Sequence, residues 1–218
     1  MFEELKEKIL NLLFPQNCFN CKKEGNYLCV DCLDDIPEPE RNDNQVIAAF
    51  DYRNKVIKHL LWKLKYENKF TIAKTLAKAL YERLLETVSE LKTISPTGKQ
   101  KIVIIPVPMH LNKLRERGYN QAELLANEFA KLDPKSFVVK TDVLTKTKET
   151  QSQMKTEGRN ERLKNIIGSF TITNQHKIKN KIVILMDDVV TTGATVKECK
   201  KLLLTARPIK IVIVSLAH

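Results

Sequence analysis

Apolar runs alternate along this chain with segments in which apolar residues recur every three to four positions. The runs are typical of strands buried in a sheet and occupy residues 46–52, 101–110, 137–144, 181–186 and 209–216. The three-to-four spacing is typical of amphipathic helices and occupies residues 2–14, 55–66, 70–91, 121–132 and 195–206. This alternation predicts an α/β fold in which a mainly parallel sheet carries helices on both faces.

Polar residues follow directly after one of the predicted strands. Asp187 and Asp188 come after the apolar run at 182–186, and a short loop at 191–195 then opens into a helix. Ligands of open α/β sheets bind outside the carboxyl ends of the strands, and the start of a helix attracts anions. Gly193 lets the backbone approach an anion closely. Two carboxylates beside such a cradle suit a ribose 5-phosphate; an ordinary turn with helix-capping aspartates is the alternative.

The segment Asp-Asp-Val-Val-Thr-Thr-Gly-Ala-Thr resembles the phosphoribosyl-pyrophosphate (PRPP) loop of type I phosphoribosyltransferases. The resemblance implies that the two acids hold the ribose hydroxyls, that the Thr/Gly loop holds the 5′-phosphate, and that Mg²⁺ accompanies PRPP. Its implied PRPP-binding residues are Asp187, Asp188, Val189, Val190, Thr191, Thr192, Gly193, Ala194 and Thr195. Ala194 departs from the many members that have Gly there, and its methyl group is tolerable if φ is negative.

Four of the five cysteines lie close together near the N-terminus, in the spacing C-x2-C-x7-C-x2-C: Cys18, Cys21, Cys29 and Cys32. Two facing C-x2-C pairs can present four thiolates tetrahedrally, as structural Zn²⁺ requires. A segment this small cannot bury enough apolar surface to fold unaided, so the metal would supply its folding energy. Disulfides, which the cytosol disfavours, and an iron–sulfur cluster are the alternatives.

The net charge of +11 is unevenly placed along the 218 residues. Residues 1–45 carry a net charge of −5, which leaves +16 on residues 46–218. So basic a domain favours polyanions such as nucleic acid or phosphorylated metabolites, although a solvated lysine-rich surface would look the same. An acidic, proline-bearing stretch at 33–45 predicts a boundary between an N-terminal part, 1–45, and a phosphoribosyltransferase-like domain, 46–218.

No apolar run approaches the roughly 20 residues of a membrane span, so no span is expected. Acidic residues precede the first apolar residues at the N-terminus, which argues against a secretory signal and favours the cytoplasm.

Several motifs together resemble the ComF family: the four-Cys knuckle, Pro-Val-Pro-Met-His with Arg-Gly-Tyr-Asn-Gln, Thr-Gln-Ser-Gln with Gly-Arg-Asn-Glu-Arg, and the PRPP loop. Members are associated with natural competence, the uptake of transforming DNA, and are thought to act beside a DNA-translocating ATPase. The resemblance implies a pyrophosphate loop with Pro108, Met109 and His110. It also implies a flexible lid at 146–165, with Gln151, Arg159 and Asn160 as contacts.

Basic residues mixed with aromatic rings suit single-stranded DNA, because cations follow the phosphates while rings stack on bases. The candidate contacts are Lys58, Lys63, Lys65, Arg115 and Arg117, with Tyr66 and Tyr119 as the rings. The alternative is that the tyrosines pack in the core and the lysines are merely solvated. The leading hypothesis is a PRPP-binding competence protein that contacts single-stranded DNA. A transferase with an unidentified acceptor and a PRPP-responsive regulator remain alternatives.

Overall fold

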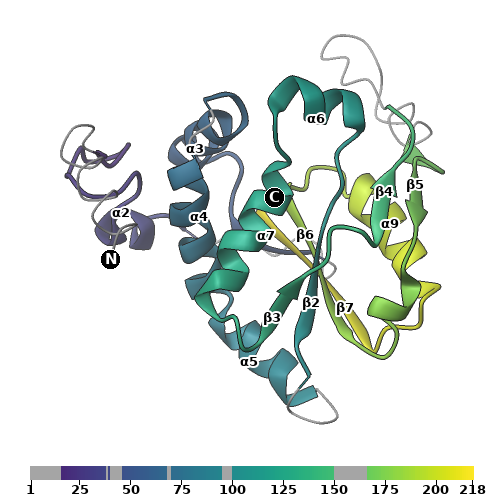
Figure 1. Ribbon diagram of the computed structural model, residues 1–218. Coiled ribbons are helices and arrows are strands. Elements are labelled where there is room, and N and C mark those ends of the chain that lie inside the picture. Colours follow the sequence, from purple (N-terminus) through teal and green to yellow (C-terminus); the bar gives the residue numbers. More distant parts are fainter. Residues whose placement is uncertain (1–15, 38, 40–45, 68–69, 95–99, 150–165) are drawn as a thin grey trace, which may run out of the picture.

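The computed structural model describes residues 16–37, 39, 46–67, 70–94, 100–149 and 166–218 (Figure 1). The helix expected at 2–14 and most of the acidic stretch expected as a boundary lie outside the described residues. Among the described helices, none combines the length and the apolar content that a membrane crossing requires.

Five strands form the main sheet, in the spatial order β1-β7-β6-β2-β3. Their bounds are β1 Val46–Phe50, β2 Ile102–Pro106, β3 Phe137–Val139, β6 Ile182–Val189 and β7 Lys210–Ala217. Every neighbouring pair in this sheet is parallel, which confirms the predicted parallel sheet. All carboxyl ends of the strands therefore meet at one edge.

Helices cover both faces of this sheet (Figure 1). On one face lie α3 (Lys55–Tyr66), α4 (Phe70–Arg83), α5 (Leu85–Ile94) and α7 (Gln121–Leu132), and on the other lies α9 (Ala194–Leu204). Alternate strand residues point to opposite faces, so Ile184 packs in the first core and Leu185 in the second. Cys199 of α9 is fully buried in the second core, as expected of a small core residue.

A second, two-stranded antiparallel sheet pairs β4 (Leu144–Lys146) with β5 (Phe170–Ile172). The single strand expected at 137–144 is thus two short strands in different sheets. β5 had no counterpart among the expected elements. Three-residue strands offer too few positions for an alternating pattern to emerge from the sequence.

Two further differences concern helices. The helix expected at 70–91 is broken at Leu84 into α4 and α5, and α5 continues to Ile94. A short helix that the sequence did not predict, α6 (Leu111–Arg117), precedes α7. It buries none of its residues, and its two leucines, Leu111 and Leu114, are too few to form an extended apolar stripe. It ends at Gly118, whose φ of 80° is left-handed.

Arg83 of α4 joins the N-terminal segment to the main sheet. Its guanidinium donates to the carbonyl oxygens of Leu33 (3.0 Å), in α2 (Val30–Asp34), and Ile36 (2.5 Å). It also donates to the carbonyl of Ala49 in β1 (3.2 Å) and lies 4.7 Å from the centre of the Phe50 ring. One side chain thus holds three backbone acceptors from two separate segments.

Candidate functional site

Asp187 and Asp188 lie inside β6, near its carboxyl end, because the strand continues to Val189. The sequence pattern had placed them just after the strand. Pairing with β7 explains the difference: Asp187 is opposite Ser215, and Val189 is opposite Ala217. A regular strand therefore positions the two carboxylates, and a hydrogen-bonded strand is more rigid than a loop.

Lys65, near the end of α3, forms an ion pair of 2.9 Å with Asp188. Both side chains are largely buried, with exposed fractions of 24% for Lys65 and 15% for Asp188. Burial opposes the charge of the Lys65 ammonium, but the Asp188 carboxylate outweighs this effect, so the pKa of Lys65 is raised. The charge of Lys65, one of the candidate DNA contacts, is thus paired with that of Asp188 in this structure.

The pKa of Asp187 is raised well above the ordinary value for an aspartate. Desolvation is the largest cause, and the neighbouring Asp188 carboxylate adds to it, while Lys65 acts in the opposite direction. The backbone N–H of Asp188 donates to Asp187 Oδ1 (2.9 Å). A buried Asp187 that resists ionisation beside a second carboxylate suits a site that receives a cation or hydroxyl donors.

We expect Asp187→Asn to stabilise the free protein as the pH rises from 4 to 8. Because the pKa of Asp187 is higher in the folded than in the unfolded state, its ionisation destabilises the fold once the pH exceeds the unfolded-state pKa. Each tenfold difference between the two acid dissociation constants corresponds to about 1.4 kcal/mol. Asparagine avoids this cost and keeps an oxygen for the backbone N–H. Urea unfolding of both proteins at pH 4 and pH 8 measures the difference, which should be near zero at the lower pH.

Asp133 is the matched control for this experiment. Burial would raise its pKa, but Lys92 at 2.8 Å outweighs burial and the pKa of Asp133 is lowered. Asp133→Asn should therefore lose stability relative to wild type at pH 8. An Asp187→Asn protein that is also less stable than wild type at pH 8 would contradict the expected sign.

The loop between β6 and α9 is the segment for which the sequence predicts a phosphate cradle. Gly193 sits at the N-cap of α9 with φ 73°, a conformation that a side chain would strain. No side chain caps the helix, so the N–H groups of its first turn are left for an anion. Ala194 is the first residue of the helix, where φ is negative, so its methyl group is accommodated.

The predicted pyrophosphate loop leaves the same edge of the sheet. Pro106 of β2 is in register with Met186 of β6, and the backbone N–H of Val107 donates to the Met186 carbonyl (2.8 Å). Residues 108–110 therefore start beside the aspartates. His110 has a structural role, since its Nδ1 accepts from the backbone N–H of Asn112 (3.3 Å) and caps α6.

Two aromatic rings lie exposed on α3, the helix whose Lys65 pairs with Asp188. Trp62 and Tyr66 have exposed fractions of 51% and 54%, and their ring centres are 5.6 Å apart. The guanidinium of Arg117 lies 5.4 Å from the centre of the Tyr66 ring. We call Trp62, Tyr66 and Arg117 the α3 surface. Trp62 was absent from the sequence-based candidates although it lies one turn before Tyr66.

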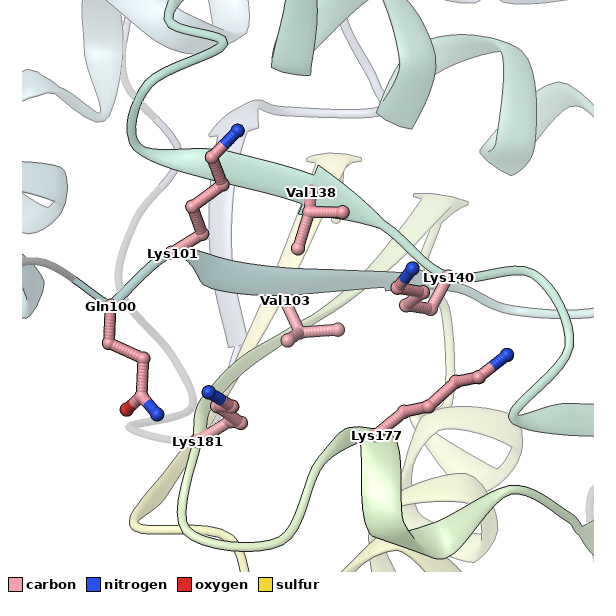
Figure 2. A pocket seen from close by; sticks show the side chains of 7 residues that line it. All are labelled: Gln100, Lys101, Val103, Val138, Lys140, Lys177 and Lys181. Carbon is pink, nitrogen blue, oxygen red and sulfur yellow. The ribbon is translucent and has the colours of Figure 1, made fainter.

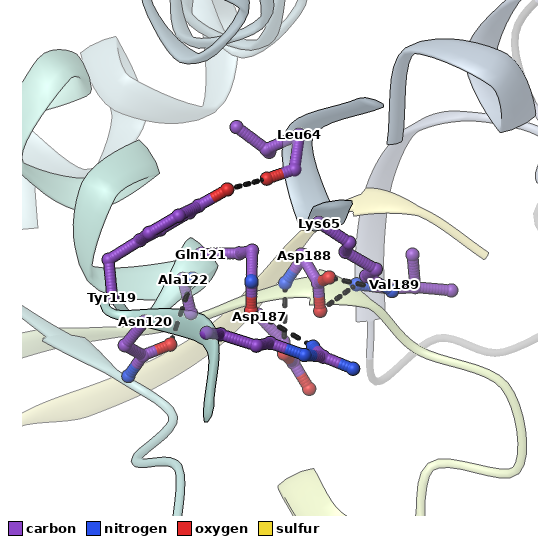
Figure 3. A network of polar contacts seen from close by, with 10 residues as sticks. Leu64, Lys65, Tyr119, Asn120, Gln121, Ala122, Asp187, Asp188 and Val189 are labelled. Carbon is purple, nitrogen blue, oxygen red and sulfur yellow. Dashed lines mark hydrogen bonds and ion pairs between the residues drawn. The ribbon is translucent and has the colours of Figure 1, made fainter. Parts of the chain in front are cut away.

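The other candidate DNA contacts are distributed differently. Lys58 and Arg115 are exposed. Lys63 pairs with Glu67 at 2.7 Å, so its charge is already neutralised. The hydroxyl of Tyr119 donates to the carbonyl of Leu64, which ties the start of α7 to the end of α3 (Figure 3). Tyr119 is thus half-buried and structural.

The four cysteines of the N-terminal segment come together. Their Sγ atoms all lie within 4.8 Å of one another, and those of Cys21 and Cys29 are 3.5 Å apart. Tetrahedral Zn²⁺ with Zn–S bonds of about 2.3 Å places its ligands about 3.8 Å apart. Cys18, Cys29 and Cys32 are buried and Cys21 is exposed. The donor set therefore fits a structural zinc ion.

The thiols of this cluster differ in acidity. Burial opposes a thiolate at Cys18, but the backbone N–H groups of Cys21, Cys29 and Asn20 outweigh it and lower its pKa to about 6. At Cys32 the Asn20 side chain favours the thiolate, yet burial and the neighbouring thiols raise the pKa to about 12. A divalent cation would overcome this resistance, since metal binding releases thiol protons.

A hollow of about 550 Å³ lies elsewhere, near the amino ends of β2 and β6 (Figure 2). Its lining consists of Gln100, Lys101, Val103, Val138, Lys140, Lys177 and Lys181. Parallel strands put their amino ends opposite the edge that carries the aspartates, so this hollow is separate from the candidate site.

The residues expected in a lid, Gln151, Arg159 and Asn160, lie outside the described residues.

Comparison with known proteins agrees with this geometry. The family model described as "Phosphoribosyl transferase domain" matches residues 114–218. Competence protein F of Haemophilus influenzae is 30% identical over 193 residues, covering 87% of this chain and 79% of that protein. Competence protein ComFC of Streptococcus pneumoniae is 32% identical over 191 residues, covering 86% and 74% respectively.

A third relative is the DNA utilization protein YhgH of Escherichia coli K12, which is 29% identical over 177 residues, or 81% of this chain and 71% of that protein. The phosphoribosyltransferase match covers β6, which carries the aspartates, and the loop that opens into α9. The described parallel sheet with helices on both faces is thus a type I phosphoribosyltransferase fold. Matches of this extent show that the chain belongs to the ComF family, the family of Competence protein F and ComFC.

Proposed function

We propose that this protein binds PRPP with Mg²⁺ at the carboxyl edge of its sheet and acts in natural competence. One observation carries the ligand assignment. The aspartate pair of β6, the uncapped start of α9 and the loop after β2 meet at the same edge. A sugar with a phosphate at one end and a diphosphate at the other matches these three features.

Each feature has a separate role in the proposal. Residues 191–195 hold the 5′-phosphate through backbone N–H groups and threonine hydroxyls. Asp187 and Asp188 hold the ribose hydroxyls and Mg²⁺, which takes oxygen ligands from carboxylates and phosphates. Residues 108–110 present the loop backbone to the diphosphate. Mg²⁺, when bound, would neutralise the diphosphate charge that the two carboxylates otherwise repel.

The competence role rests on the relatives, whose names refer to competence and to DNA utilization. We place this chain in the cytoplasm with single-stranded DNA as its partner, beside a DNA-translocating ATPase, and assign a structural Zn²⁺ to its four cysteines. The α3 surface supports DNA contact because it joins exposed rings to a guanidinium. Lys65 helps a polyanion approach, since it neutralises Asp188 next to that surface.

Transformation frequency in a deletion strain tests the role in competence. Complementation with the wild-type gene should restore transformation, and complementation with the Asp188→Asn gene should not. Release of pyrophosphate from PRPP in the presence of a defined acceptor would favour a transferase instead. Normal transformation of the deletion strain would refute the proposed role.

Single-stranded DNA should quench the fluorescence of Trp62, the only tryptophan in the chain. Stacking on a ring contributes about 1–3 kcal/mol per base, so Trp62→Ala should weaken binding at least about fivefold. Affinity should also fall steeply with salt, because each neutralised phosphate of a single strand gives a slope of about −0.7. Fluorescence titration detects the quenching, and anisotropy of labelled DNA compares the variants.

Leu85→Ala is the matched control, because Leu85 is also exposed (51%) but lies on α5. It should leave the affinity for DNA unchanged. An affinity for DNA that stays constant between about 50 and 200 mM salt would refute an electrostatic DNA contact. Concentration-dependent self-association that Trp62→Ala abolishes would instead identify the α3 surface as a protein interface.

A further inference from the structure

Gln121 has a buried side-chain nitrogen, Nε2, without a hydrogen-bond partner among the described residues. The residue has an exposed fraction of only 2%. Within the described part of the chain, nothing accepts a hydrogen bond from its Nε2. A buried donor that has lost its water and gained no acceptor destabilises a folded protein, so its presence requires an explanation.

The position of Gln121 suggests what the explanation is. It is the first residue of α7, which packs against β6, and its Oε1 accepts from the Arg117 guanidinium (3.4 Å). That guanidinium lies over the ring of Tyr66, the neighbour of Lys65, and Lys65 pairs with Asp188. Figure 3 shows the Gln121 side chain directed toward the aspartate pair. The unpartnered nitrogen thus faces the side of β6 that carries the aspartate pair, the proposed ribose site.

The carboxylates of the aspartate pair and the N–H group of Gln121 together favour one kind of ligand group. A hydroxyl group both donates and accepts a hydrogen bond, so it can donate to a carboxylate and accept from an amide N–H at once. A phosphate oxygen only accepts when ionised, and two nearby carboxylates repel it. A hydroxyl is therefore the group that satisfies the aspartates and the Gln121 amide together.

We propose that Gln121 is a ligand-binding residue whose Nε2 donates to a ribose hydroxyl held by the aspartate pair. The inference rests on the proposed binding of PRPP and adds to it a residue from α7. In the free protein the amide is unsatisfied, and the arriving sugar supplies its acceptor. The hydration of the Gln121 amide nitrogen is lost when the protein folds. The hydrogen bond to the sugar therefore forms without a further desolvation cost for this nitrogen.

Gln121→Met tests the proposal, because methionine has a similar shape but no donor. Calorimetry with PRPP and Mg²⁺ should show binding about three- to tenfold weaker than in wild type, as expected for one hydrogen bond. Urea unfolding of the free protein should show a midpoint equal to or above that of wild type, since the unsatisfied donor is gone. A residue with a merely structural role would instead lower the midpoint.

Two controls identify the contact. Affinity for Mg²⁺-pyrophosphate should be the same in Gln121→Met and wild type, because pyrophosphate has no sugar hydroxyl; an equal loss there would overturn the hydroxyl assignment. If Gln121 acted by holding Arg117, Arg117→Met would cause the same loss for PRPP and the double variant would add nothing. That outcome would also overturn the proposal.

The failure of this inference can be told apart from failure of the proposed function. Wild-type protein that does not bind PRPP would refute both. Wild-type protein that binds PRPP, together with a Gln121→Met variant that binds equally well, would refute only the role of Gln121.

Discussion

Asp188→Asn is expected to weaken binding of PRPP with Mg²⁺ about ten- to a hundredfold. Asparagine keeps one acceptor oxygen but loses the charge that attracts the cation and strengthens the hydrogen bond to a sugar hydroxyl. Hydrogen bonds to charged groups contribute about 1.5–3 kcal/mol, which corresponds to this range. The substitution also removes the partner of Lys65, whose ammonium stays largely buried beside Asp187.

Isothermal titration calorimetry of wild type and variant measures this change directly. Asp133→Asn is the control, since Asp133 pairs with Lys92 near the amino end of β3, opposite the edge that carries Asp188. It should bind PRPP as wild type does. Equal affinity of wild type and Asp188→Asn for PRPP would show that the aspartate pair does not bind this ligand.

Cys29→Ser is expected to abolish zinc binding and to unfold the N-terminal segment. Its three remaining thiols would leave the tetrahedron open, and structural zinc sites contribute on the order of 10–16 kcal/mol in isolated finger peptides. Leu28 and Leu33 are buried beside the cysteines and would lose their packing with the metal. The zinc content, measured by metal analysis after anaerobic purification, should fall from about one ion per chain in wild type to near zero in the variant.

Hydrogen exchange should at the same time show loss of protection in residues 16–36. Cys199→Ser provides the control, because Cys199 lies in the second core under α9, far from the four-cysteine cluster in sequence and packing. That variant should retain its zinc. Stoichiometric iron with a visible absorption band in the wild-type protein would refute the zinc assignment.

The longer elements of the fold could be predicted because their apolar pattern is extended and regular. The expected helix at 55–66 coincides with α3, and the central strand at 182–186 is the buried part of β6. Elements with little burial escaped prediction: α6 has no buried residue, and β4 and β5 have three residues each. Their positions depend on contacts between distant parts of the chain, which local pattern does not encode.

The same distinction applies to the candidate site. The aspartates and the phosphate cradle form one continuous motif and were visible in the sequence. Lys65 and Gln121 acquire their importance from neighbours on other elements, whereas the neighbour of Trp62, Tyr66, lies on the same helix. One signal for Lys65 was available, because it follows the buried Leu61 by four residues and so borders the apolar stripe of α3. Nothing in the sequence around Gln121 shows that its amide is buried without a partner.

The three carbonyl contacts of Arg83 have a consequence for the order in which the chain matures on the ribosome. Arg83 is separated from its acceptors by 34, 47 and 50 residues, and it is synthesised after all of them. At about 5–20 residues per second, the cysteine segment leaves the ribosome several seconds before the guanidinium that secures it. The N-terminal segment is therefore synthesised before the arginine that docks it, and the cysteines of the proposed zinc site would meet their metal ion during that interval.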